Sequence, residues 1–329
     1  MKQIVNRCTK KQINLTYIIP ICLLAILVLI AINPAKYSVV AYKGLEVWAK
    51  VLVPSLLPFF IFTKLISSGD FLNDFTSLFA PITKKVYNCP AKSAFVFFMS
   101  IISGYPVGAK LISDLYNNNE FSKDDALKTL SFSCNSGPMF ILGSVAIGMF
   151  TSKKMGIIIY FSHILGSLLN GLIYRKIKTN TCKASALNNQ TCNKSNFSES
   201  VSSSISSILL IGGVICFTFV LIEAITDNFI FVKIISVFSY FGINQDILAA
   251  IFSGIFEITK GCLMLSEIPL SFNTATMLCT FIISFGGIST LLQATAFTKN
   301  IIPTKTFIRQ KITHALCATL ISFILLCIF

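Results

Sequence analysis

Several stretches of about 20 residues in this chain carry almost no charge, and this feature limits the fold more than any other. An apolar helix of that length crosses about 30 Å of hydrocarbon, where each backbone N–H and C=O must be bonded within the protein. Charged residues make up 12% of the chain, whereas soluble domains carry about 25%. We therefore expect an all-α polytopic membrane protein whose surroundings are the lipid bilayer.

The remaining composition excludes several classes of protein. The net charge of +14 comes from basic residues scattered among short loops, so we expect cytoplasmic loop charges and no nucleic-acid partner. The cysteines form no CxxC pair and only two histidines occur, so we expect no metal site. We expect no cofactor, and we leave open a coupling ion, either Na⁺ or H⁺. No hydrolase or phosphate-binding motif occurs, so we do not expect an enzyme.

The apolar segments form two groups of four that follow a first helix and are separated by one polar loop. We expect a retained first helix at Tyr17–Ile32, because no small-residue cleavage pattern clearly follows it. The other segments are Leu45–Ser67, Ser93–Leu115, Ala126–Phe150, Met155–Tyr174, Ser204–Thr226, Asp246–Leu265, Ala275–Phe297 and Thr306–Phe329. The expected organisation is an N-terminal segment with the first helix (1–40), a first repeat (41–175), a cytoplasmic polar linker (176–200) and a second repeat (201–329).

A polar phrase occurs once in each half, inside apolar sequence. It reads Ser-Gly, five further residues and Lys, at Ser103–Lys110 and at Ser253–Lys260. A second break follows each copy at nearly the same spacing, at Ser133–Pro138 and at Ser284–Thr290. Irregular backbone at membrane depth is tolerated only where protein or a water-filled cavity covers it. Paired breaks in corresponding positions of two halves are typical of a transporter's binding site.

Loop charges favour a topology in which both Ser-Gly segments turn back as re-entrant hairpins. If every segment crossed the membrane, the basic loop Arg175–Lys194 would lie outside, against the positive-inside rule. With hairpins, this loop lies inside together with the basic loop Lys299–Lys311. Each half then crosses three times, so the two repeats are inverted. We predict about seven spanning helices and two hairpins, with the N-terminus inside.

The breaks and the residues beside them are the candidate substrate site, because freed amides and half-helix ends bind charged groups. Lys110 and Lys260 suit a substrate with two negative charges. Glu257 is expected to accept a proton, ligate sodium or neutralise Lys260, and Glu223 is expected to form a helix-packing hydrogen bond. We place Gly254 in the second hairpin tip. The candidate substrate-binding residues are Ser103, Gly104, Tyr105, Pro106, Gly108, Lys110, Asn135, Ser136, Gly137, Glu257, Lys260, Gly286, Gly287 and Ser289.

At these phrases the chain resembles the YlbJ family, sporulation integral membrane proteins of endospore-forming bacteria. The matching phrases are Pro54–Phe59, Ser103–Lys110, Asn135–Phe140, Phe256–Gly261 and Ser284–Ser289. The resemblance implies a nucleoside-recognition or gate domain in each half. It also implies a role in moving dipicolinic acid, a dianion, across the outer forespore membrane.

A more remote resemblance is to concentrative nucleoside transporters, which are built as helix, re-entrant hairpin, broken helix and helix, repeated in inverted orientation. The first tip departs from their pattern, because Tyr105-Pro106-Val107 stands where a nucleoside carrier has polar and acidic residues. The leading hypothesis is therefore a transporter of a small anionic metabolite, most of all dipicolinate. A non-transporting membrane scaffold and a nucleoside carrier are the alternatives, and self-association into a homo-oligomer stays open.

Overall fold

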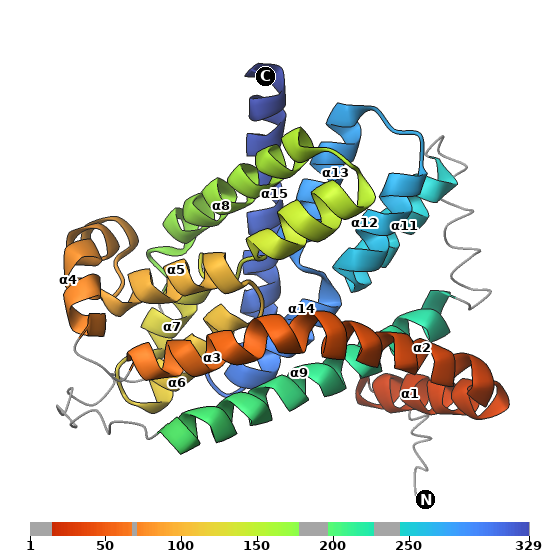
Figure 1. The fold of residues 1–329 in the computed structure, drawn as a ribbon, viewed down its shortest axis with the longest axis horizontal. Helices are drawn as coiled ribbons and strands as arrows, with labels where there is room; N and C mark the ends of the chain where they lie inside the picture. Colours follow the sequence, from red (N-terminus) through yellow and green to blue (C-terminus); the bar gives the residue numbers. More distant parts are fainter. Residues whose placement is uncertain (1–14, 68–70, 178–196, 227–243, 329) are drawn as a thin grey trace, which may run out of the picture.

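Helices form nearly all of the computed structural model, which describes residues 15–67, 71–177, 197–226 and 244–328 (Figure 1). These residues contain no strand. The helices up to residue 174 are α1 (Leu15–Ile32), α2 (Pro34–Val47), η1 (Trp48–Leu52), α3 (Val53–Ser67), α4 (Phe71–Ile82), η2 (Thr83–Tyr87), α5 (Lys92–Ser103), α6 (Val107–Asn117), α7 (Lys123–Leu130), η3 (Met139–Met149) and α8 (Lys153–Tyr174). The later ones are α9 (Phe197–Thr226), α11 (Gln245–Phe256), α12 (Ile258–Glu267), α13 (Phe272–Phe285), α14 (Gly287–Thr298) and α15 (Thr304–Ile328).

Within the described residues, four helical stretches are long and apolar enough to cross a membrane. They are Lys153–Tyr174, Phe197–Thr226, Phe272–Thr298 and Thr304–Ile328. A fifth results if Leu23–Ile32 and Pro34–Lys50, which meet at 109°, count as one span. Large apolar side chains such as Leu169, Leu209 and Leu320 point outward from these helices, as expected for surfaces that face lipid. The prediction of an all-α polytopic membrane protein is confirmed in these terms.

Three of the predicted apolar segments match single helices. The predicted segments at 155–174, 204–226 and 306–329 correspond to α8, α9 and α15. Helix α4 lies between two predicted segments and was missed. The predicted polar linker at 176–200 lies mostly outside the described residues.

The chain folds back at the first Ser-Gly phrase. Helix α5 ends at Ser103, Gly104 adopts a φ of 86°, and α6 begins at Val107 after a cis Tyr105–Pro106 peptide bond. A Cβ built on Gly108 would lie 3.1 Å from the Cβ of Ser100. Eight residues of continuous helix would separate those positions by about 12 Å, so the two arms lie against each other.

The chain also folds back at the second phrase, but at a later residue. Helix α11 continues through Gly254 to Phe256, and only Glu257 leaves the helical conformation, with φ −144° and ψ 120°. A Cβ built on Gly261 would overlap the Cα of Gly254, so α11 and α12 pack arm against arm (Figure 1). The prediction that Gly254 forms the tip was wrong. Its missing side chain serves the packing of the two arms instead.

The backbone departs from regular helix at both positions where a broken helix was predicted. Residues 131–137 leave the regular helical path between α7 and η3. The break between α13 and α14 is much shorter, and it consists of Gly286 and Gly287 with φ values of 88° and 66°. These left-handed values are readily adopted only by glycine, which explains why the sequence places a Gly-Gly pair there.

Two apolar clusters form the interior, and each combines helices from both halves of the chain. One contains Ile112 and Leu130 from the first half with Ile211 and Phe307 from the second. The other contains Ile141 and Ile159 with Cys279 and Ile283. Tyr105, at the first tip, packs against both clusters. The tip therefore lies at the boundary between them, beside both broken helices.

Candidate functional site

The first tip packs backbone to backbone on the first broken helix. A Cβ on Gly108 would overlap the carbonyl oxygen of Ser133, and one on Gly104 would lie 2.5 Å from the backbone nitrogen of Gly137. From the other side, a Cβ on Gly137 would lie 2.9 Å from the carbonyl oxygen of Ser103. Only glycine permits this approach at all three positions. The structure thus brings Ser103, Gly104, Gly108 and Gly137 together, as the sequence predicted for one site.

This first contact contains polar atoms without partners. The hydroxyls of Ser103 and Ser133 and the Oδ1 atom of Asn135 are buried and accept or donate no hydrogen bond among the described residues. The Nδ2 atom of Asn135 does donate, to Ser100 Oγ at 3.1 Å and to the carbonyl of Phe132 at 2.9 Å. A buried polar atom without a partner costs about 1–3 kcal/mol. The contact therefore buries three oxygen atoms whose hydrogen-bonding capacity is not used among the described residues.

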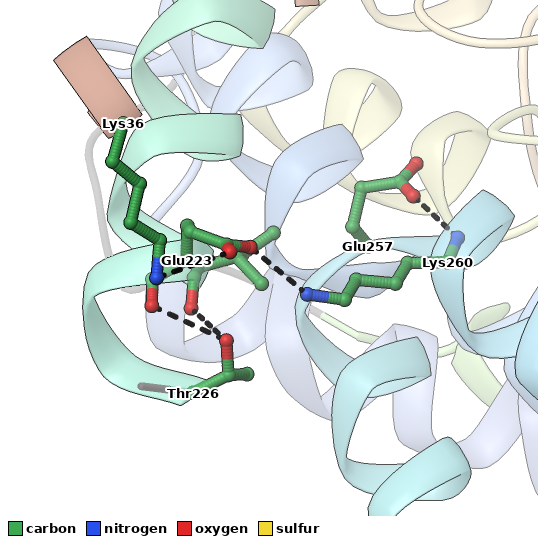
Figure 2. A network of polar contacts seen from close by, with 6 residues as sticks. Lys36, Glu223, Thr226, Glu257 and Lys260 are labelled. Atoms are coloured by element: carbon green, nitrogen blue, oxygen red, sulfur yellow. Dashed lines mark hydrogen bonds and ion pairs between the residues drawn. The ribbon is translucent and has the colours of Figure 1, made fainter. Parts of the chain in front are cut away.

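The second tip packs on the second broken helix in a similar way. A Cβ on Gly287 would lie 3.1 Å from the carbonyl oxygen of Phe256 and 3.3 Å from that of Gly254. Here a charged side chain organises the turn, because the Glu257 carboxylate accepts from the backbone N–H of Lys260 at 2.7 Å (Figure 2). The carboxylate also accepts from the Thr259 hydroxyl at 3.0 Å. Glu257 is thus the N-cap of α12.

Lys260 does not pair with Glu257 through its ammonium. The Nζ atom of Lys260 lies 3.3 Å from Glu223 Oε2, and Lys36 approaches the other oxygen of Glu223 at 3.7 Å (Figure 2). Glu223 therefore carries a bridging ion pair, where we expected a helix-packing hydrogen bond. One of our alternatives, that Glu257 neutralises the Lys260 ammonium, was wrong. The carboxylate that pairs with this ammonium is Glu223.

Lys110 has its own carboxylate partner. Its Nζ lies 3.0 Å from Asp114 Oδ1, one helical turn later in α6, and 5.7 Å from the ring centre of Phe297. Lys110 and Lys260 therefore pair with different acids on different helices. Their joint role towards a dianion stays a prediction.

The hydroxyl of Ser289 contacts neutral polar side chains. Ser289 is buried in α14, with its hydroxyl 3.3 Å from that of Thr218 on α9 and 3.4 Å from the Nε2 atom of Gln293. These contacts join α14 to α9. The expected role of Ser289 in substrate binding stays a prediction.

The most buried charged group at the breaks is Lys311, which the sequence did not single out. We expected it in a cytoplasmic basic loop, and this was wrong: its side chain is 3% exposed, in α15. Its Nζ donates to the Tyr105 hydroxyl at 2.6 Å and to the carbonyl of Cys134 at 3.1 Å. The same Nζ lies 4.8 Å from the centre of the Tyr105 ring. A Cβ on Gly286 would lie 3.1 Å from that hydroxyl.

Two histidines complete this cluster, which we call the Lys311 cluster and which comprises Lys311, Tyr105, Cys134, His163, His314 and Ser284. His163 Nε2 accepts from the backbone N–H of Ser136 at 2.9 Å, and its Nδ1 lies 2.8 Å from Ser284 Oγ. His314 Nε2 lies 3.0 Å from the carbonyl of His163, and the two rings are 4.8 Å apart. The available signal was that the chain's only two histidines stand in the middle of apolar segments, one in each half.

The helices, the fold-backs and the buried polar cluster at the breaks define an integral, multi-pass membrane protein with a polar centre inside its helical body. Comparison with known proteins agrees. Residues 49–150 match the family model described as "Gate: Nucleoside recognition", a stretch that includes the first tip and the first broken helix.

The chain is also similar to the "Sporulation integral membrane protein YlbJ" of Bacillus subtilis (strain 168). The two are 29% identical over 280 residues, which cover 76% of this chain and 67% of the relative. The resemblance to the YlbJ family drawn from the sequence phrases is thereby confirmed, and the gate-domain match lies in the first half of the chain. A gate domain in the second half stays a prediction. No solved structure matches the chain.

Proposed function

We propose that this protein is a secondary transporter of a small anionic metabolite, with dipicolinate as the leading substrate, and that it is not an enzyme. The observation that carries the proposal is the paired contact of fold-back and broken helix. Gly104 and Gly108 seat the first tip on residues 133–137, and Gly287 receives the second tip at Phe256. Discontinuous helices that meet in both halves of a membrane protein are the usual setting of substrate and ion sites in transporters.

The proposed topology has about seven spans and two re-entrant hairpins, which makes the halves inverted. It is tested by cysteine accessibility at Asn118, an exposed residue at the end of α6. With hairpins, an impermeant thiol reagent added from the cytoplasmic side labels Asn118→Cys. If every segment crosses, only reagent on the opposite side labels it. The same test applies at Lys183, which lies outside the described residues.

The substrate class rests on the lysines beside the breaks. Lys110 and Lys260 are each paired with a carboxylate, Asp114 and Glu223, at 3.0 Å and 3.3 Å. In the loaded state, the two carboxylates of a dianion replace those partners. The relative is a sporulation integral membrane protein by name, which agrees with a spore metabolite and with placement in the outer forespore membrane.

The decisive experiment is uptake of labelled dipicolinate into liposomes that contain the purified protein. Lys110→Gln should abolish uptake while the protein still inserts. Lys50→Gln is the matched control, because Lys50 also pairs with an acid one turn away, Glu46, but at the exposed surface. Equal uptake by both variants would remove the role given to Lys110. No uptake by the unaltered protein under any ion gradient would favour a non-transporting scaffold.

A nucleoside carrier is the second candidate, because the family model that matches residues 49–150 is described as nucleoside recognition. Competition separates the two substrates. If uridine displaces bound dipicolinate and is itself taken up, the nucleoside function gains. If uridine has no effect at concentrations that saturate dipicolinate binding, the anionic substrate stands.

A further inference from the structure

Among the residues that the structure describes, the Lys311 ammonium is buried without a counter-ion. Lys110 and Lys260 each lie within 3.3 Å of a carboxylate oxygen, whereas no carboxylate of the described residues forms an ion pair with Lys311. Its side chain is 3% exposed. A lysine inside a membrane protein is expensive and marks function by default, usually on a pathway for ions, protons or substrate.

The surroundings of Lys311 nevertheless fit the charged form. An ammonium has three N–H donors and no acceptor. Three acceptors lie around Nζ: the Tyr105 hydroxyl at 2.6 Å, the Cys134 carbonyl at 3.1 Å and His314 Nδ1 at 3.4 Å. Tyr105 in turn donates to the carbonyl of Ile283 at 3.4 Å. The three acceptors therefore match the three N–H groups of a protonated Lys311. All three acceptors are neutral groups.

The hydrogen bonds also define the state of both histidines. His163 Nε2 accepts from an amide, so the ring carries its proton on Nδ1 and donates to Ser284. His314 Nε2 faces a carbonyl oxygen, which only accepts, so Nε2 carries the proton and Nδ1 is free to accept from Lys311. A second proton on His314 would place two cations 3.4 Å apart. The cluster thus holds a single exchangeable charge.

The position of this charge matters as much as its state. Cys134 lies just beyond the C-terminal end of α7, and Ile283 lies in the last turn of α13. The C-terminal ends of helices carry partial negative charge and, in transporters with broken helices, hold the coupling cation. In this chain a tethered ammonium occupies that position. It joins the first tip, through Tyr105, to the broken helices of both halves.

Building on the transport function proposed above, we propose that Lys311 is the proton-binding site that couples transport to a pH gradient. The Lys311 amine takes one proton from one aqueous phase and releases it to the other, so that only an N–H bond forms and breaks. The titratable groups that face Lys311 are Tyr105 at the tip, Cys134 at the first break, His163 on α8 and His314 on its own helix. The contacts from α13 and α14 come from backbone and from Ser284.

Proton loss has a direct structural consequence. The neutral amine of Lys311 has one N–H fewer than the ammonium. It also has no charge to attract the carbonyl of Cys134 and the ring of Tyr105. The first tip then keeps its glycine contacts and the apolar packing of Tyr105 and Val107, but loses the attraction of the ammonium. Protonation of Lys311 closes the tip on both broken helices, and deprotonation loosens it.

The transport test compares net uptake with exchange. Net dipicolinate uptake driven by a pH gradient requires proton binding and release, whereas exchange of labelled for unlabelled substrate at equal pH does not. In Lys311→Met we expect loss of pH-driven uptake while exchange persists. The control Lys305→Met, an exposed position on the same helix, should respond to the gradient like the unaltered protein. Full pH-driven uptake by Lys311→Met overturns the proposal.

A second measurement needs no substrate. Hydrogen exchange of the peptide that contains residues 104–112 is measured at acidic and alkaline pH, corrected for the intrinsic rate with an unstructured peptide. We expect protection of the tip to fall at alkaline pH in the unaltered protein and in Lys305→Met. Lys311→Met should show low protection at both pH values, and Lys311→Arg, which stays charged, should show high protection at both.

The two proposals fail separately in these tests. If the protein transports dipicolinate but ignores a pH gradient, the role of Lys311 is refuted and the transport function stands. If it transports no dipicolinate at all, the transport function fails and hydrogen exchange alone decides the Lys311 site. Tip protection that is independent of pH in the unaltered protein refutes the site in either case.

Discussion

The two tips reach the same kind of contact by different local chemistry. The first tip uses glycines on both sides of the contact and has no side-chain cap, because Pro106 stands at the N-cap of α6. The second tip has a carboxylate, Glu257, that caps α12, and one glycine on the broken helix. The two similar sequence phrases therefore give similar backbone fold-backs, but different groups stabilise the two turns. The first tip depends on close backbone approach, and the second depends on hydrogen bonding.

The largest loss of stability is expected from a substitution that breaks the contact between the first tip and the first broken helix. In Gly108→Ala the new Cβ overlaps the Ser133 carbonyl oxygen, which is backbone and cannot rotate away. We expect destabilisation at or above the upper end of the roughly 1–3 kcal/mol typical of overpacking, measured as a lower melting temperature in detergent.

Two matched variants sharpen this test. Gly143→Ala is the control, since nothing lies within 4 Å of a Cβ there. Gly287→Ala at the second contact should cost less, about 1–2 kcal/mol, mostly from its φ of 66°. If Gly287→Ala destabilises the protein more than Gly108→Ala does, the first tip does not depend more on close backbone approach than the second.

The second-largest effect is expected when the Tyr105 hydroxyl is removed. The second tip has no equivalent hydroxyl, because Ile255 stands at the corresponding position of its phrase. Tyr105→Phe keeps the ring and deletes one acceptor of the Lys311 ammonium. A hydrogen bond to a charged group contributes about 1.5–3 kcal/mol, and we expect a loss of that size in thermal or denaturant unfolding. A loss below the error of the measurement would show that Tyr105 contributes only its ring.

A smaller effect is expected at the cap of the second tip. Glu257→Ala removes the acceptor for the Lys260 amide and should destabilise by about 1 kcal/mol. Glu257→Gln keeps a carbonyl oxygen there and should lose less. Hydrogen exchange of residues 258–261 reports the difference locally, and equal protection in both variants would contradict the capping role.

The smallest effect concerns the ion pairs beside the tips. Lys110→Met and Lys260→Met each remove one partner of a partly exposed pair, and such pairs contribute about 0–1 kcal/mol. We expect little change in melting temperature from either variant. A large loss in one of them alone would mean that its pair supports the fold of that half.

Sequence reasoning found the breaks because glycine and proline mark them directly. Gly104, Pro106, Pro138 and the Gly286-Gly287 pair all lie where the helices stop. It misplaced the second tip because Gly254 looked like its counterpart Gly104. The residue that leaves the helix is Glu257, and a carboxylate serves as a cap only once the following amides are exposed.

The two histidines of the Lys311 cluster left a signal in the sequence, but the place of Lys311 in the cluster could not be predicted, for a physical reason. Lys311 contacts Tyr105 and Cys134, which are separated from it by 206 and 177 positions along the chain. Nothing in the local pattern distinguishes a lysine that enters a protein interior from one that reaches the cytoplasm, since both follow a basic loop and precede an apolar helix. Only the packing of α15 against α8 and α13 decides between the two.

The glycine contact of the first tip also has a kinetic consequence. Because Gly104, Gly108 and Gly137 contribute no side chains, parting the glycine contact itself requires no rotamer to change. The resistance to release comes from the residues beside the glycines, namely the hydroxyl of Tyr105 and the apolar packing of Tyr105 and Val107. A membrane protein built in this way can cycle one short segment many times while its helices keep their places.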